Sequence, residues 1–445
     1  MLRSRASLGS ARVNGNRAVA GARRCSTRVV VVRCANEPKT NPKIVIIGGT
    51  GRVGASTASA LLKLIPEAQL TLSSRNQESF TETLIRRPDL KDSTFKKVDV
   101  LSVSSVLEAI LGADLVIHTA GPFQRTENHS VIEAAIAARV PYIDVCDDTP
   151  YSEQSKNLYS AACVAAGIPA IISAGIYPGT SNVMAAHILS LARKEYDEDM
   201  NYQTPPEGEG VEPSKLMYSY YTAGSGGAGP TILATTFLLA GEEAIVYREG
   251  KKYTYPPLSN RREVDFGPGV GRKGVYLYNL PEVESAHKYL RVPGVSTRFG
   301  TDPFVWNWLM WLMARLIPRF LLNDVKFAQS MAKLSDPLVR TVDKLVGEAV
   351  AMRIEIDFSK GKNSAGLFVH KKLSESMGYS VAAFADSILQ GNTDVGVWYP
   401  EEQGALKDRR RFFSIASTGC DRFDLNKSAW SMESDIKQIG GLIYW

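Results

Sequence analysis

The chain has 445 residues, of which 44% are hydrophobic and 22% are charged, so its length suggests two or three globular domains. Its longest uninterrupted apolar runs are too short for a membrane-spanning helix, which needs about 18 residues or more. The formal net charge is +6, yet residues 1–40 hold nine Lys/Arg and one acid, so residues 41–445 carry about −2. This balance excludes the broad basic surface of a nucleic-acid-binding protein.

Residues 1–40 are rich in Arg, Ser and Ala and lack the apolar core of a secretory signal. The stretch Val32-Arg-Cys-Ala35 resembles the cleavage region of chloroplast transit peptides. We therefore predict a plastid transit peptide over residues 1–40 and a protein of the chloroplast stroma. Association of the protein with thylakoids or plastoglobules is a further possibility within the plastid. A mitochondrial address and a disordered basic arm are the alternatives.

From Asn41 to about Ile176, strand-like and helix-like segments alternate. This alternation predicts an α/β fold, a Rossmann-type doubly wound parallel sheet, over residues 41–178. The expected strands are 44–47, 69–73, 94–98, 115–119, 142–145 and 170–174. The expected helices between them are 55–64, 77–86, 104–111, 130–138 and 151–166.

The first turn reads GGTGRVG and joins an expected strand to an expected helix. Glycines at this junction allow a tight turn and the close approach of a pyrophosphate to the helix N-terminus. The candidate cofactor-binding residues are Gly48, Gly49, Thr50, Gly51, Arg52, Val53 and Gly54. A glycine turn kept for packing alone is the alternative. An ATP-binding P-loop is excluded, because Ala55 stands where that loop requires lysine.

The second strand ends in Ser74-Arg75 and lacks the acid that binds the ribose hydroxyls of NAD. A hydroxyl and a guanidinium suit the 2′-phosphate of NADP(H), whereas a solvated loop arginine is the alternative. Asp99, after the third strand, is expected near the adenine edge. Ala120 and Gly121, after the fourth strand, are expected to run toward the nicotinamide.

For residues 179–372 the sequence predicts a second α+β domain with a mostly antiparallel sheet. Residues 373–445 are expected to form a C-terminal segment, part of which returns to the first domain through a helix at 378–389. The expected strands of the second domain are 216–222, 244–247, 252–255, 275–277, 352–358 and 367–370, and a helix is expected at 231–239. A second glycine loop, Thr222–Gly229, is a candidate for holding a substrate carboxylate or a flexible turn.

Several short stretches follow one another along residues 41–402. They are GGTGRVG, HTAGPF (118–123), YIDVCD (142–147), GIYPGTSNVMA (175–185), SGGAGPT (225–231), PEVES (281–285) and GVWYPEE (396–402). With these stretches the chain resembles the saccharopine dehydrogenase-like NADP-binding oxidoreductase family, in particular its plant, algal and cyanobacterial plastid-type members. The resemblance covers most of residues 41–402. It implies a Rossmann domain, a mixed second domain and NADP(H), but it does not identify the substrate.

Tyr177 and Asp147 are weak candidates for a proton donor, because both follow expected strands at the ligand-binding edge. Packing of Tyr177 and helix capping by Asp147 are the alternatives, and His118 reads as a core histidine. Tyr247 and Lys251 match Tyr-x-x-x-Lys, but they lie between strand-like runs and are interpreted as a chance match. The scattered cysteines and histidines predict no metal site.

Two functions are consistent with these patterns. One is an NADP(H)-dependent oxidoreductase that acts on a small imine, an amino-acid-derived compound or another carbonyl-like substrate. The other is a non-catalytic NADP(H)-binding sensor or assembly protein.

Residues Phe304–Ile317 contain twelve apolar side chains out of fourteen, including three of the six tryptophans of the chain. On a helical wheel, Asn307, Arg315 and Arg319 fall on one side, and the rest is apolar. This pattern predicts a helix that lies on a membrane or lipid surface, or else a core helix or the interface of a homodimer.

Overall fold

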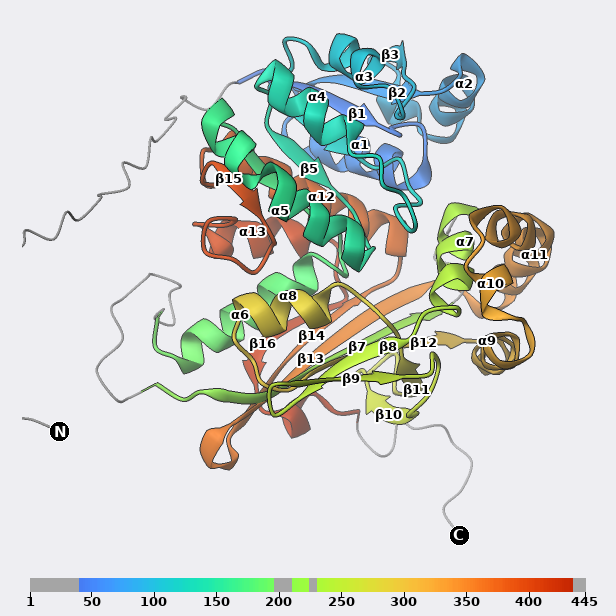
Figure 1. Ribbon diagram of the computed structural model, residues 1–445, viewed down its shortest axis with the longest axis vertical. Helices are drawn as coiled ribbons and strands as arrows, with labels where there is room; N and C mark the ends of the chain where they lie inside the picture. Colours follow the sequence, from blue (N-terminus) through green and yellow to red (C-terminus); the bar gives the residue numbers. More distant parts are fainter. Residues whose placement is uncertain (1–39, 196–209, 224–229, 435–445) are drawn as a thin grey trace, which may run out of the picture. The chain divides into compact units, whose positions relative to one another are not determined.

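The computed structural model describes residues 40–195, 210–223 and 230–434 (Figure 1). Their first part forms a seven-stranded sheet, β15-β6-β5-β4-β1-β2-β3, in which every neighbouring pair is parallel. The order reverses between β1 and β4, as in dinucleotide-binding folds. The predicted doubly wound sheet is therefore confirmed. Its strands are β1 (Lys43–Ile47), β2 (Gln69–Ser74), β3 (Thr94–Lys97), β4 (Leu115–His118), β5 (Tyr142–Asp144), β6 (Pro169–Ile171) and β15 (Gly396–Trp398).

Both faces of this sheet are covered, which explains why its strands read as apolar runs rather than alternating ones. Ile44 and Ile46 of β1 belong to one core cluster, whereas Val45 and Ile47 belong to another. The connecting helices are α1 (Arg52–Leu64), α2 (Gln77–Arg86), α3 (Val103–Ile110), α4 (Ser130–Ala138) and α5 (Thr149–Ala166), with the 3-10 turn η1 (Pro88–Leu90).

After His370 the chain returns to the first sheet, and it then adds one last strand, β16 (Arg422–Lys427), to the second sheet. Helix α12 (Leu373–Leu389) begins five residues before the predicted helix and packs on α1, where a Cβ on Gly378 would lie 2.5 Å from the Ser56 carbonyl oxygen. Strand β15 then pairs with β6, and α13 (Arg409–Ala416) packs on α12.

The second sheet has nine strands in the described residues, with the path β10-β11-β12-β7-β13-β14-β16. Off this path, β8 pairs with β12 and β9 pairs with β8. It is antiparallel except for β12 and β7, which are parallel, so the expected mostly antiparallel α+β domain is confirmed. Its strands are β7 (Pro213–Ala223), β8 (Ala244–Arg248), β9 (Lys251–Tyr255), β10 (Arg262–Asp265), β11 (Arg272–Leu277), β12 (Val295–Asp302), β13 (Ala349–Phe358), β14 (Asn363–His370) and β16 (Arg422–Lys427).

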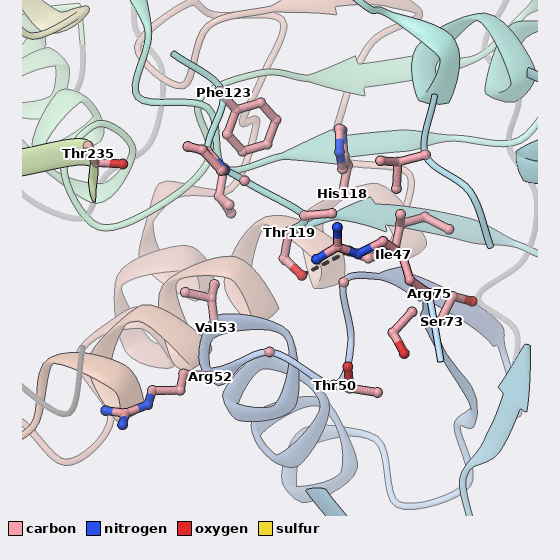
Figure 2. Close-up of a pocket in the computed structure, with 18 of the residues that line it drawn as sticks. Ile47, Thr50, Arg52, Val53, Ser73, Arg75, His118, Thr119, Phe123 and Thr235 are labelled. Carbon is pink, nitrogen blue, oxygen red and sulfur yellow. Dashed lines mark hydrogen bonds between the residues drawn. The ribbon is translucent and has the colours of Figure 1, made fainter. Parts of the chain in front are cut away.

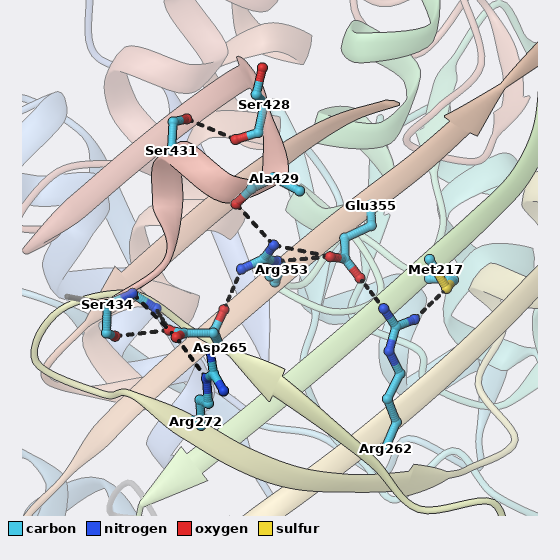
Figure 3. A network of polar contacts seen from close by, with 11 residues as sticks. Met217, Arg262, Asp265, Arg272, Arg353, Glu355, Ser428, Ala429, Ser431 and Ser434 are labelled. Carbon is cyan, nitrogen blue, oxygen red and sulfur yellow. Dashed lines mark hydrogen bonds and ion pairs between the residues drawn. The ribbon is translucent and has the colours of Figure 1, made fainter. Parts of the chain in front are cut away.

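An ion-pair network crosses this sheet (Figure 3). The guanidinium of Arg353 on β13 is buried, donates to the Asp265 and Ala429 carbonyl oxygens at 2.6 and 3.2 Å, and contacts Glu355 at 3.0 Å. Ser434 donates through its hydroxyl to Asp265 at 2.8 Å. Because a buried charge is tolerated only when it is paired and hydrogen-bonded, this network fixes the chain after β16 onto the sheet.

In the described residues between β6 and β13, the chain forms six α-helices. Helix α11 was not predicted from the sequence, because Pro337 interrupts an otherwise amphipathic pattern. The helices are α6 (Thr180–Ala192), α7 (Pro230–Leu239), α8 (Glu282–Tyr289), α9 (Phe304–Leu316), α10 (Arg319–Leu322) and α11 (Val325–Val346), and the 3-10 turns are η2 (Ser359–Gly361) and η3 (Ala429–Met432).

Helix α9 departs from its expected orientation. Arg315 and Arg319 are exposed, as the helical wheel predicts, but Asn307 is buried. Its side chain accepts from the Thr301 N–H at 3.1 Å and donates to the Thr301 carbonyl oxygen at 2.6 Å. The polar Asn307 therefore faces the protein, because it satisfies the backbone at the end of β12. None of the helices in the described residues is long and apolar enough to cross a membrane.

Candidate functional site

The glycine turn between β1 and α1 is too tight for side chains at most of its positions. Gly48 has φ +78°, and a Cβ there would lie 2.7 Å from the Ala120 nitrogen. A Cβ on Gly49 would approach the Ile46 carbonyl oxygen to 2.8 Å, and one on Gly54 would approach the Gly48 carbonyl oxygen to 2.5 Å. Gly48, Gly49 and Gly54 thus allow the turn itself and its contacts with neighbouring backbone.

Gly51 has a different role, because it faces a cavity of about 940 Å³ together with Thr50, Arg52 and Val53. A Cβ on Gly51 would meet a single atom, the Gly48 carbonyl oxygen, at 3.1 Å. Helix α1 begins here without an acid in its first turn, so its N–H groups and dipole favour an anion. In Figure 2 the Arg52 side chain extends away from Thr50 and Ser73. This geometry fits a pyrophosphate at Gly51.

The end of β2 lies in the same cavity. Ser74 donates to the Asn76 carbonyl oxygen at 2.8 Å and lies 2.9 Å from the Ser79 hydroxyl, while the Arg75 side chain is exposed at the cavity wall (Figure 2). The Asn76 side chain caps α2 by accepting from the Ser79 N–H at 3.2 Å. A hydroxyl cluster with an adjacent guanidinium matches what a 2′-phosphate requires.

Helix α2 adds residues that sequence reasoning missed. Arg86 lines the cavity and donates to the Thr50 carbonyl oxygen at 3.2 Å, and Thr83 donates to the same oxygen at 2.8 Å. The Ser79 hydroxyl lies 3.3 Å from that of Thr50. Ser79, Thr83 and Arg86 share one face of α2 at helical spacing, a signal that was available in the sequence.

The predicted adenine and nicotinamide loops also line the cavity. Asp99 follows β3, and its carboxylate accepts from the Leu101 N–H at 3.0 Å. Ala120 and Gly121 follow β4 and pass over Gly48. The structure therefore brings together the predicted loops, but the role of each residue as a cofactor contact stays a prediction.

Asp147 is the acid best placed for proton transfer in this cavity. Its carboxylate accepts from the Gln124 amide at 2.7 Å, and Gln124 accepts from Thr235 of α7 at 3.1 Å. Burial raises the pKa of Asp147 to about 7, assisted by the Asp148 charge and opposed by the Gln124 hydrogen bond. The capping alternative is wrong, because Asp148 caps α5 by accepting from the Tyr151 N–H at 2.8 Å.

Tyr177 lines the same cavity but is held by packing. Its ring stacks on Tyr220 with centroids 4.6 Å apart, and Tyr220 donates to Glu282 at 2.8 Å. Burial, together with the Glu282 charge, raises the pKa of Tyr177. Glycine is required at position 179 of the same loop, since a Cβ there would lie 1.9 Å from the Gly175 carbonyl oxygen.

His118 and the Tyr247–Lys251 match are less suited to catalysis. Burial lowers the pKa of His118 to about 4, and its Nδ1 lies 3.3 Å from the Tyr142 hydroxyl. Tyr247 lies on β8 and Lys251 on β9, where their cross-strand partners are Lys252 and Arg248, and Glu249 and Gly250 form the turn between them. The two residues therefore do not share a helix face, and the Tyr-x-x-x-Lys string is a chance match. Within the described ranges, no group of three or more metal-binding side chains occurs. Loop residues 224–229 lie outside those ranges.

Comparisons with known proteins agree with this geometry. Residues 44–171 match the family model of the saccharopine dehydrogenase NADP-binding domain. Carboxynorspermidine synthases of Vibrio alginolyticus and Vibrio cholerae are each 30% identical over 271 residues, which cover 57% of this chain. The chain spans 61% of the length of these relatives.

Among solved structures, apo saccharopine dehydrogenase (L-Glu forming) from Saccharomyces cerevisiae superposes with a TM-score of 0.57 over 84% of this chain and 96% of that one. The identity is 13%, so this likeness concerns the fold. The predicted resemblance is thus supported for the first domain and for the fold of the chain, while the plastid-type subgroup stays a prediction. Residues 44–171 are thus similar to the NADP-binding domain of saccharopine dehydrogenases.

Proposed function

We propose that this chain is an NADP(H)-dependent oxidoreductase that transfers hydride to or from the carbon of an imine, or of a related amino-acid-derived carbonyl compound. The observation that carries the proposal is Asp147, a carboxyl of raised pKa that lies in the same cavity as Gly51 and Arg75. A cofactor site and a proton donor that share one cavity are what such a reduction requires.

The fit to NADP(H) rests on three features of the chain. The start of α1 at Gly51 accepts the pyrophosphate, Ser74 and Arg75 suit the 2′-phosphate, and Arg86 adds a second guanidinium on the same wall. When bound, the cofactor supplies or accepts the hydride. The match of residues 44–171 to an NADP-binding domain family supports the same choice.

Asp147 acts as the acid in the reducing direction. Its protonated carboxyl donates to the substrate nitrogen or oxygen while the neighbouring carbon gains hydride, so that C=N becomes CH–NH. Gln124 orients the carboxyl, and Thr235 orients Gln124 from the second domain. In the oxidising direction the carboxylate takes the proton back.

The test is turnover by the purified chain. Saccharopine and carboxynorspermidine, the compounds named in the relatives, are offered with NADP+, and formation of NADPH is followed by absorbance. A wider set of secondary amines and amino-acid-derived aldehydes with ammonia or amino acids follows. Turnover that Asp147→Asn abolishes supports the proposal. Tight NADPH binding without turnover of any of these substrates favours a non-catalytic sensor or assembly protein.

We further propose that the protein works in the plastid. The composition of residues 1–40, with nine Lys/Arg and one acid, supports an organellar address, and residues 1–39 lie outside the described part of the chain. A reporter fused behind residues 1–40 should enter chloroplasts, and the native protein should begin near Ala35. Import into mitochondria, or an intact N-terminus, would contradict this.

A further inference from the structure

The surface of α9 and α10 carries an unusual concentration of exposed apolar side chains. Fifteen large apolar residues are exposed in the described part of the chain, and six of them lie within residues 304–320. Phe304 is 76% exposed, Trp308 58% and Phe320 73%. The six residues, here called the α9 patch, are Phe304, Val305, Trp308, Trp311, Leu316 and Phe320.

The patch is displayed by the way in which α9 is fixed to the protein. Asn307 and Met310 are its buried residues, and the Asn307 amide holds both backbone groups of Thr301 at the end of β12. Phe304, Trp308 and Trp311 are four and three residues apart, so they follow one face of the helix. Because the polar Asn307 side chain is buried against β12, the face with Phe304 and Trp308 is exposed to solvent.

The charges within the segment that carries the patch are basic. Between Pro303 and Asn323 the sequence contains two arginines and no acid. The Arg315 guanidinium lies 4.0 Å from the centre of the Trp311 ring, and Arg319 pairs with the exposed Glu243 at 2.8 Å. Lys326, near the start of α11, is also exposed, while Asp324 beside it accepts from the Phe327 N–H.

We propose that the α9 patch docks this protein onto a lipid surface that carries anionic headgroups. Tryptophan beside arginine suits the boundary between headgroups and acyl chains, where an aromatic ring is buried and a cation stays at the phosphates. The helix has thirteen residues and packs against β12, so it is too short to span a bilayer and the attachment is peripheral. A second copy of the chain fits less well, because two such surfaces placed face to face would bring arginines of like charge together.

The experiment is flotation of the full-length protein with vesicles of phosphatidylcholine alone or mixed equally with phosphatidylglycerol. The basic residues 1–40 also attract anionic lipid, and high salt screens that attraction more than apolar insertion. Flotation is therefore measured at low salt, where Arg315→Glu is compared with wild type, and at high salt, where the apolar variants are compared. Wild type should float with the mixed vesicles, and its tryptophan emission should shift to shorter wavelength.

The double variant Phe304→Ser/Trp308→Ser should lose about ten-fold or more in partitioning. The matched control, Leu158→Ser/Trp430→Ser, removes two equally exposed apolar side chains elsewhere and should float like wild type. Arg315→Glu should weaken binding to mixed vesicles more than to phosphatidylcholine. Unchanged NADPH affinity and melting temperature show that each variant is folded.

Three results would overturn the proposal. The first is wild-type protein that remains unbound to both vesicles. The second is equal flotation of the Phe304→Ser/Trp308→Ser variant and wild type. The third is a wild-type dimer in solution that this variant converts to a monomer, which would make the patch a subunit interface.

Discussion

The two ends of the cavity are built in opposite ways. At the cofactor end, Gly51, Ser74 and Arg75 come from one stretch of chain and offer N–H groups, hydroxyls and positive charge to an anion. At the substrate end, Asp147 is oriented through Gln124 by Thr235, a residue 111 positions from Gln124. At this end burial raises the pKa of Asp147 to about 7, so its carboxyl binds a proton more readily than an exposed carboxyl does.

The difference indicates that cofactor binding and proton transfer should respond separately to substitution. A change at the cofactor end should alter affinity, whereas a change at the substrate end should alter turnover and its pH dependence. Each prediction below either separates the two ends further or shows that the separation is wrong.

The largest effect is expected from Asp147→Asn, which keeps a hydrogen-bond acceptor for Gln124 but removes the proton donor. The rate of reduction should fall about 10²–10⁴-fold with NADPH affinity unchanged. In wild type, reduction should slow as pH rises through about 7, where Asp147 loses its proton, and oxidation should show the opposite trend. Steady-state kinetics across pH measure both.

The neighbouring Asp148→Asn is the control for this variant, because asparagine also caps helices well. Its rate should stay within about ten-fold of wild type. An Asp147→Asn enzyme that retains the wild-type rate and pH profile would remove Asp147 from the mechanism.

Next in size is Gly51→Val, whose methyl groups would fill the space in front of the α1 N-terminus. Loss of charge-assisted contacts to the pyrophosphate should weaken NADPH and NADH alike, by about 100-fold or more. Isothermal titration measures both affinities. Gly51→Ala adds the same Cβ, 3.1 Å from the Gly48 carbonyl oxygen, without the methyl groups and should lose far less. Equal losses in the two variants would point to backbone strain instead.

The parts of this cavity that could be predicted are those whose residues are close together in the sequence. The strand, glycine turn and helix around Gly51, and the Ser74-Arg75 pair, are consecutive in sequence, so pattern and turn chemistry identify them. The parallel sheet followed from alternating apolar and helical segments for the same reason. Arg86 was missed although its helical spacing from Ser79 was visible.

The substrate end could not be predicted, because its contacts join distant parts of the chain. The hydrogen bond between Gln124 and Thr235 depends on how α7 packs against the loop after β4, and no local pattern specifies that. The burial of Asn307 had the same origin, since the helical wheel does not reveal the backbone of Thr301. In both cases the contact joins residues from different secondary-structure elements, and the local sequence pattern does not reveal it.

Arg75→Ala should separate the two cofactors. Removing a guanidinium from the 2′-phosphate costs about 1.5–3 kcal/mol, so NADPH affinity should drop about ten-fold or more while NADH affinity changes little. Lys91→Ala removes an exposed positive charge from the same domain and serves as the control. Equal losses for NADPH and NADH would show that Arg75 does not read the 2′-phosphate and that Arg86 is the better candidate.

The smallest effect concerns the stability of the fold at Glu282, a buried carboxyl that accepts from Tyr220 next to Tyr177. Burial raises the pKa of Glu282 to about 7, so the folded protein keeps this proton at pH values where the unfolded chain has lost it. Stability therefore falls as pH rises from about 4.5 toward 7, and Glu282→Gln removes this dependence. The variant should be similar to wild type near pH 5 and more stable by about 1–3 kcal/mol near pH 8.

The exposed Glu108→Gln is the control and should leave the pH dependence of stability unchanged. Chemical denaturation at the two pH values measures the stability of all three proteins. A Glu282→Gln protein that is less stable than wild type near pH 8 would mean that the Tyr220 hydrogen bond to the charged carboxylate outweighs the cost of burying it.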